Sequence, residues 1–170
     1  MAFQAATAAN SLLQRAFKER RTDMTPMKVQ KLLYFLNGWH LAITGEPAVH
    51  EPFEVWKYGP VIPCVYQGLK QFADGPVTSY IKTLDPATFE LKAFVASDSA
   101  KEFQEVLDLT WEKYIGIDAL SLSAMTHAPD SPWSAARRKA MGTIPNESIK
   151  DYFIGLARTT RSQPAASHAS

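Results

Sequence analysis

The chain contains 170 residues, of which 46% are hydrophobic and 21% are charged, and its formal net charge is +1. This length and composition predict one globular domain with a continuous hydrophobic core. A net charge near zero gives no strong electrostatic field, so the composition does not predict binding to bulk nucleic acid or to an anionic membrane. The only cysteine is Cys64, which excludes an internal disulfide, and no apolar run approaches the ~20 residues of a transmembrane helix. We therefore expect a cytoplasmic protein.

The predicted elements begin with two helices. The first lies within residues 1–21 and presents an apolar face formed by Ala9, Leu12, Leu13, Ala16 and Phe17. The second runs from Thr25 to Gly45, and apolar side chains cover roughly half of its circumference. Thr25 is a natural N-cap, Pro26 suits the first helical position, and Gly45 can close the last turn. This second helix is expected at the centre of the fold, with an outer face limited to Gln30, Lys31, Tyr34 and Asn37.

The middle of the chain predicts two short strands and a third helix. The segment from Phe53 to Tyr58 is rich in aromatic residues, as in a short strand, and Tyr58-Gly59-Pro60 is expected to form the turn after it. The third helix should begin at Val61 or Pro63 and end near Ala73. The segment from Thr88 to Val95 has the period of a half-buried strand, so it can pair with the first strand. Its expected buried side consists of Phe89, Leu91, Ala93 and Val95.

The C-terminal half predicts further helices. Ser97 or Asp98 is expected to cap a helix whose buried face contains Phe103, Val106, Leu107, Trp111, Tyr114 and Ile117. Shorter helices are expected over Leu120 to His127 and Trp133 to Ala140, and a last helix begins at Pro145 or Asn146. Residues 158–170 are expected to form a disordered tail. The whole pattern predicts a mainly α protein, in which residues 1–157 form a single compact domain of about six helices around a central buried helix, with a small two-stranded sheet.

The sequence contains no clear catalytic or metal-binding motif. Its histidines form no HExxH or paired CxxC pattern, so no metal site is predicted. Cys64 lies near a predicted helix N-terminus, where a thiol pKa can be lowered, and a hydrolase could pair Cys64 or Ser123 with His127. No local signature supports such a pair. We therefore expect neither an enzyme nor a bound cofactor.

Basic residues cluster at two places, Lys18 to Arg21 and Arg137 to Lys139. A DNA-binding autorepressor would need one of these clusters to face a groove, and the first two helices are close enough in sequence to form a helix-turn-helix. Solvated helix ends explain both clusters more simply, because the net charge is small and aromatic residues are not interleaved with the basic ones. Binding to nucleic acid is therefore an alternative and not the expectation.

Large apolar residues are concentrated in the predicted loops. They are Phe53, Trp56, Tyr58, Pro60, Pro63, Pro132 and Trp133. Such side chains either fill the core or form a contact surface for another protein. Taken singly, most of them are best explained as core residues. Taken as a group, they favour a protein-binding module over an active site.

Several of these segments resemble a known family. The segment Leu32-Leu33-Tyr34 with Trp39, the turn from Trp56 to Pro60, and Thr126-His127 ahead of Ser131-Pro132-Trp133 are similar to the Panacea domain of SocA-like antitoxins. The similarity covers about Met24 to Phe153, which is nearly the whole predicted domain. Cys64 and the alanine-rich N-terminus are individual to this chain.

The resemblance implies an antitoxin that neutralises its cognate toxin by direct protein binding. For the SocA type, it also implies an adaptor that delivers the toxin to the ClpXP protease, and residues 158–170 or the N-terminal helix are candidates for that contact. The candidate partner-binding surface combines the turn after the first strand with the loop before Trp133. Its residues are Trp56, Tyr58, Gly59, Pro60, Val61, His127, Pro132 and Trp133. The alternative is that these residues brace one another inside the domain.

Overall fold

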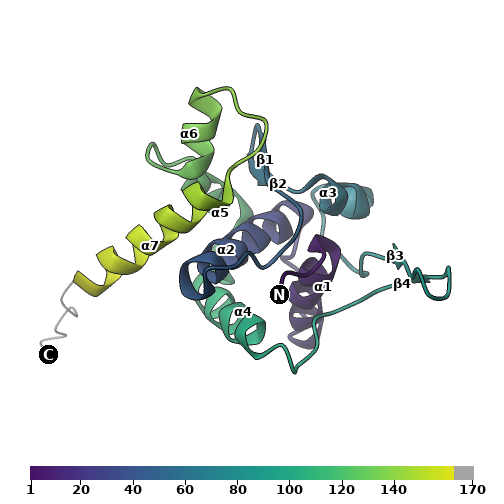
Figure 1. Cartoon of the computed structure of the whole chain (residues 1–170). Coiled ribbons are helices and arrows are strands. Elements are labelled where there is room, and N and C mark those ends of the chain that lie inside the picture. The colour runs from purple at the N-terminus through teal and green to yellow at the C-terminus, as the bar shows by residue number, and fades with distance from the viewer. Residues whose placement is uncertain (163–170) are drawn as a thin grey trace, which may run out of the picture.

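In the computed structural model, which describes residues 1–162, the helices gather around one central helix (Figure 1). This helix is α2 (Pro26–Thr44). Its neighbours are α1 (Ala5–Lys18), α3 (Pro63–Leu69), α4 (Lys101–Tyr114), α5 (Ala119–Thr126) and α7 (Asn146–Ser162). A 3-10 helix, η1 (Lys70–Phe72), continues α3, and α6 (Pro132–Arg138) lies against α5 and α7. The predicted mainly α fold around a central helix is confirmed, with seven α-helices in the described part of the chain.

Both ends of α2 are the ones that the sequence predicts. The Thr25 hydroxyl accepts a hydrogen bond of 3.2 Å from the backbone N–H of Lys28, and Pro26 occupies the first turn. At the other end Gly45 has a φ of 82°, a left-handed conformation that glycine adopts without the strain of a Cβ atom. Capping groups at both ends satisfy backbone groups that a helix leaves unpaired, so α2 is well defined before any packing is considered.

The predicted outer face of α2 is wrong, because every residue from Lys28 to Leu41 is buried. Gln30, Lys31, Tyr34 and Asn37 are each no more than 4% exposed. Other parts of the chain cover this face and provide partners for some of its polar groups. The Asn37 carboxamide oxygen, for example, accepts a 2.9 Å hydrogen bond from the backbone N–H of Ala48. A helix covered on all sides by its own chain cannot enter a DNA groove, which removes the predicted helix-turn-helix alternative.

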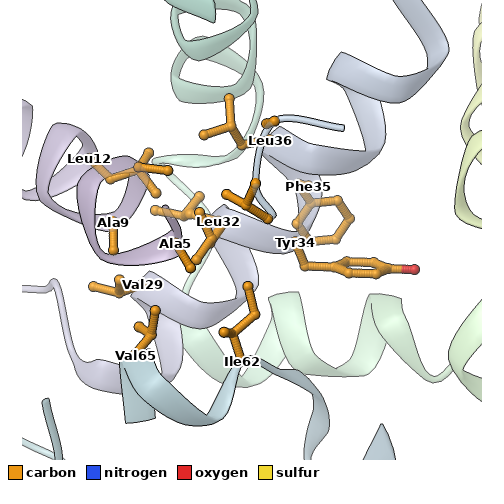
Figure 2. Close-up of a cluster of buried hydrophobic side chains, with 14 of the residues drawn as sticks. Ala5, Ala9, Leu12, Val29, Leu32, Tyr34, Phe35, Leu36, Ile62 and Val65 are labelled. Carbon is orange, nitrogen blue, oxygen red and sulfur yellow. The ribbon is translucent and has the colours of Figure 1, made fainter. Parts of the chain in front are cut away.

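Helix α1 packs closely against α2 through small side chains. Figure 2 shows Ala5 and Ala9 of α1 facing Val29 and Leu32 of α2, while Tyr34 points to the other side of the helix. Alanine side chains let two helices approach, and their burial removes apolar area from water. The predicted apolar face of α1 is confirmed, since four of its five residues are fully buried and Phe17 packs against the core.

The first predicted strand is shorter than expected and pairs with a different partner. Strand β1 (Glu54–Trp56) is antiparallel to β2 (Gly59–Val61), with Trp56 opposite Gly59. The turn therefore consists of Lys57 and Tyr58, and Gly59 and Pro60 belong to the second strand. The expected turn at Tyr58-Gly59-Pro60 is wrong, since the observed turn starts one residue earlier and ends two residues earlier, because local hairpin closure needs only two residues between the strands.

The expected pairing of Thr88–Val95 with the first strand is also wrong. Within this segment only Leu91–Lys92 is a strand (β4), and it pairs with β3 (Thr83–Leu84) in a second hairpin that projects from the body (Figure 1). The residues of the expected buried side are all exposed, and Phe89 is 79% exposed. An alternating pattern predicts a strand but cannot say whether anything covers its apolar side.

The C-terminal helices match most of the predicted boundaries. Asp118 caps α5 and Ser131 caps α6, each through a side-chain oxygen that accepts a backbone N–H. Helix α4 begins at Lys101, later than expected, and neither Ser97 nor Asp98 caps it, because the Ser97 hydroxyl instead accepts from the backbone N–H of Ser99.

The last helix, α7, continues to Ser162, beyond the expected domain end at Ala157. The rest of the predicted tail, residues 163–170, lies outside the described residues. None of the helices between residues 1 and 162 combines the length and the apolar character that a membrane span needs.

Candidate partner-binding surface

The β1–β2 hairpin is held at its turn by a required glycine. Gly59 has a φ of 113°, a conformation that L side chains rarely adopt. A Cβ atom at this position would lie 2.6 Å from the Thr126 hydroxyl oxygen and 2.8 Å from Lys31 Cε. Both distances are shorter than a van der Waals contact. Gly59 therefore lets the hairpin lie directly on α2 and α5.

Side chains of α5 and α6 bind the backbone of this turn at consecutive positions. The Trp133 indole N–H donates to the Trp56 carbonyl at 3.0 Å, and the Ser123 hydroxyl donates to the Tyr58 carbonyl at 2.6 Å. Between them, His127 Nε2 lies 3.2 Å from the Lys57 carbonyl. Three successive carbonyls are thus contacted by the domain body, so the turn has a fixed conformation.

His127 and Trp133 also contact each other. Their ring centroids are 4.0 Å apart, and the Trp133 side chain is 3% exposed. The other ring nitrogen of His127, Nδ1, lies 2.6 Å from the Ser123 carbonyl. A neutral imidazole has one N–H and can donate to only one of its two neighbouring carbonyls. The His127 ring thus lies between the end of α5 and the hairpin turn and can donate to the backbone of one of them.

The structure brings the predicted site residues together but divides them into two kinds. Gly59, Pro60 and Val61 form the buried strand β2 of the hairpin, and the buried Pro132 and Trp133 lie at the start of α6. Tyr58 is 58% exposed, and Trp56 and His127 are partly exposed. The Trp56 indole N–H donates to a Glu54 carboxylate oxygen at 2.7 Å. Some of the predicted residues are thus buried within the domain, and others form an exposed aromatic surface beside them.

A groove of about 430 Å³ opens beside this turn, between the start of α2, the hairpin and α3. Its walls include Met27, Trp56, Lys57, Tyr58 and Tyr66, with Lys31 at its base. The Trp56 and Tyr66 rings meet edge to face, with centroids 5.0 Å apart.

Lys31 is a site residue that sequence analysis missed. Its side chain is 1% exposed, and Nζ donates to the Pro60 carbonyl at 3.2 Å. Desolvation lowers the pKa of Lys31 to about 8. The sequence did offer an indication of this role. A lysine in a helix predicted to be central must either reach solvent or have a specific hydrogen-bond partner. The expected outer face of α2 assigned it to solvent.

The residues of the alternative hydrolase are not arranged as a nucleophile and its base. The Ser123 hydroxyl donates to a backbone carbonyl, and both His127 ring nitrogens face backbone carbonyls. Partial desolvation of the Cys64 thiol and the nearby Glu51 raise its pKa, which favours the unreactive thiol form even though part of the residue faces solvent. No group of histidine, cysteine or acidic side chains within residues 1–162 could hold a metal ion.

Part of each basic cluster contacts its own surroundings. The Arg21 guanidinium pairs with Asp23 at 2.9 Å, and Asp23 also pairs with the buried Lys28 at 2.8 Å. Arg137 lies over the Trp133 ring, 5.1 Å from its centroid, and Arg138 donates to the Pro129 carbonyl. These contacts are those of helix ends, as the sequence favoured.

Comparison with known proteins gives two matches. Residues 29–134 match the family model described as "Antitoxin SocA-like, Panacea domain". The chain is also 31% identical over 130 residues to Antitoxin SocA of Caulobacter vibrioides (strain NA1000 / CB15N), covering 76% of this chain and 68% of that relative. No solved structure matches the chain. The matched region includes most of α2, the β1–β2 hairpin and Trp133.

Proposed function

The chain belongs to the family of SocA-like antitoxins with a Panacea domain, and from this premise we propose that it neutralises its cognate toxin by direct binding. The proposed contact surface is centred on the β1–β2 turn and includes the exposed parts of Trp56, Tyr58 and His127. Gly59, Pro60, Val61, Pro132 and Trp133 act as its support. Membership in an antitoxin family implies a cognate toxin, and an exposed aromatic surface on a fixed backbone suits a protein partner.

The observation that carries the proposal is the fixed turn beneath an exposed aromatic residue. Tyr58 is 58% exposed, yet its own carbonyl and the two carbonyls before it are contacted by α5 and α6. Aromatic side chains supply much of the binding energy at protein interfaces. A side chain on a rigid backbone loses less conformational entropy on binding than one on a mobile loop. The turn is thus suited to act as an anchor.

Neutralisation in this proposal uses burial of toxin surface and no catalytic step or cofactor. The polar atoms of Ser123 and His127 are engaged by backbone carbonyls, so they contribute to the support of the turn. We place this event in the cytoplasm, as the sequence predicts from its single cysteine.

We further propose that this chain delivers the bound toxin to the ClpXP protease. The N-terminal helix is a poor candidate for the protease contact, because most of α1 is buried against α2. The end of α7 is a better candidate, since residues 158–162 are exposed. A degradation assay with purified ClpXP, the toxin and this protein tests it. Loss of toxin degradation in a variant ending at Ala157, with toxin binding retained, supports the contact, and unchanged degradation contradicts it.

The proposed function is tested with the neighbouring open reading frame. We expect its product to arrest growth when expressed alone and to be harmless when this chain is expressed with it. The two proteins should also co-purify and elute together in size-exclusion chromatography. Growth arrest that persists in the presence of this chain, or rescue without a complex, would contradict neutralisation by direct binding.

A further inference from the structure

The Lys31 amine is buried without a counter-ion. The ion pairs of the described residues involve Arg15, Arg21, Lys28 and Lys92, and Lys31 is not among them. An ammonium group has three protons to donate, and the Pro60 carbonyl accepts one. Burial of a charge without a partner is costly, and proteins usually avoid it.

Lys28, one turn earlier on α2, is a second buried lysine with which Lys31 can be compared. Its side chain is 2% exposed, and its Nζ lies 2.8 Å from an Asp23 carboxylate oxygen. It also donates to the Ile115 carbonyl at 2.7 Å. Lys28 thus has both a counter-ion and a carbonyl, while Lys31 has only the carbonyl. By comparison with Lys28, the group that Lys31 lacks is a carboxylate.

The groove above Lys31 is prepared for a negative charge. None of its lining residues is an aspartate or glutamate, and Lys57 stands exposed at its rim. Pro26 and Met27 bring the start of α2 into the lining, and the first turn of that helix has no acidic residue to offset the positive end of its dipole. Lys31, Lys57 and the helix start therefore give one side of the groove a positive potential.

The other walls of the groove are apolar. Trp56 and Tyr66 form an aromatic corner, and Val61 and Leu69 extend it. A free small anion would leave these walls in contact with water. A polypeptide segment that carries one carboxylate among large apolar side chains would satisfy both the positive side and the apolar walls, and carboxylates are the anions of an unmodified protein chain.

We propose that this groove receives a segment of the cognate toxin in which an aspartate or glutamate lies among large apolar side chains, with its carboxylate paired to the Lys31 amine. The proposal rests on the proposed function and names the chemistry that the toxin presents. The Tyr58 turn forms one wall of the groove, so the segment in the groove and the aromatic contact surface belong to one interface.

The test measures the dissociation constant between the purified toxin and variants of the full chain by calorimetry. We expect Lys31→Met and Lys31→Gln to raise the Kd at pH 7 by roughly tenfold or more, because removing one partner of a buried charge pair leaves the other unpaired. The control is Lys101→Gln, at an exposed lysine at the start of α4, which should leave the Kd unchanged. Thermal unfolding of each variant shows whether it is folded, and Lys31→Met removes a buried unpaired charge and should keep the fold.

A second measurement identifies the carboxylate by pH. Because the pKa of Lys31 is about 8 in the free protein and a carboxylate raises it, binding above pH 8 must take up a proton. The wild-type Kd should rise by about tenfold per pH unit above this value, and the proton uptake should vanish in Lys31→Met. Other titratable groups near the groove are Lys57, Tyr58 and Tyr66 in its lining, with Glu54 and His127 contacting the hairpin behind it.

The outcomes separate the two proposals. If the wild-type chain does not bind the toxin, the proposed function and this inference both fail. If the wild type binds and Lys31→Met and Lys31→Gln bind equally well without a change in proton uptake, the function stands and the groove proposal is overturned. Replacing each aspartate and glutamate of the toxin by its amide then identifies the residue that pairs with Lys31. The proposal requires one such replacement that weakens binding to the wild-type chain but not to Lys31→Gln.

Discussion

The indole nitrogen of Trp133 donates a hydrogen bond of 3.0 Å to the backbone carbonyl of Trp56. The two residues are 77 positions apart in the sequence and belong to α6 and β1. Trp133 is 3% exposed, while Trp56 is partly exposed and lies at the groove. One tryptophan thus supports the backbone of the other. Substitutions on the two sides of this contact should separate the stability of the domain from its binding.

Replacement of Trp133 should act on stability. We expect Trp133→Ala to lower the free energy of unfolding by about 3–5 kcal/mol. Removal of this large buried side chain leaves a cavity, and the Trp56 carbonyl loses its hydrogen-bond donor. Urea denaturation followed by circular dichroism measures this. A denaturation midpoint equal to that of the wild type would show that Trp133 does not brace the hairpin.

Replacement of Tyr58 should act on binding instead. The side chain is 58% exposed, so we expect Tyr58→Ala to change the free energy of unfolding by less than about 0.5 kcal/mol. Toxin affinity should fall by about tenfold or more if this side chain is an interface anchor. Leu84→Ala is a matched control, because Leu84 is 57% exposed on the other hairpin. Equal toxin affinity in the two variants would argue against the proposed surface.

Gly59 should tolerate no side chain. With its φ of 113° and the contacts of a Cβ atom with Thr126 and Lys31, we expect Gly59→Ala to cost about 2 kcal/mol or more in unfolding free energy. Because the same change moves the turn, toxin affinity should fall as well. Gly116→Ala serves as the control, since a Cβ there meets nothing within 4 Å and Gly116 does not have a positive φ. Thermal unfolding of both variants measures the difference.

Two glycines in helices should respond in opposite directions. A Cβ atom on Gly38 of α2 would collide with the Phe153 ring of α7, whereas one on Gly155 of α7 would meet nothing within 4 Å. We expect Gly38→Ala to destabilise the domain by about 1–3 kcal/mol through overpacking. Gly155→Ala should stabilise it by about 0.5–1 kcal/mol, because alanine favours a helix. Destabilisation by Gly155→Ala would contradict the placement of α7.

Lys31 should make the stability of the free domain depend on pH. Burial lowers its pKa to about 8 from the ordinary 10.5, so between these values the unfolded chain binds more protons than the folded one. Stability should therefore rise as the pH increases from about 8 toward 10.5, by up to roughly 3 kcal/mol. Urea denaturation at pH 7.5 and 9.5 should show this rise in the wild type, and Lys31→Met should be without it. An equal rise in both would assign the effect to other groups.

Local signals were sufficient to predict most helices. The Thr25 cap, Pro26 and Gly45 predicted both ends of α2, because a cap is an interaction between residues close in sequence. The strand pairing was predicted wrongly because an apolar pattern does not identify its partner, and each strand in fact pairs with one close in sequence, β1 with β2 and β3 with β4. The apolar pattern from Thr88 to Val95 is the same whether its surface is covered or, as here, exposed.

The sequence by itself determined the presence of the helices, both ends and the central place of α2, and the family, since each depends on residue types at short or fixed spacing. Tertiary structure alone decided that α2 is buried on every side, that Trp133 supports the turn from which Tyr58 projects, and that Lys31 lies beneath a groove with no carboxylate. The reason is physical. The exposure of a side chain and the partners of its charge depend on which distant segments pack against it. The residues next to it in the sequence do not specify those segments.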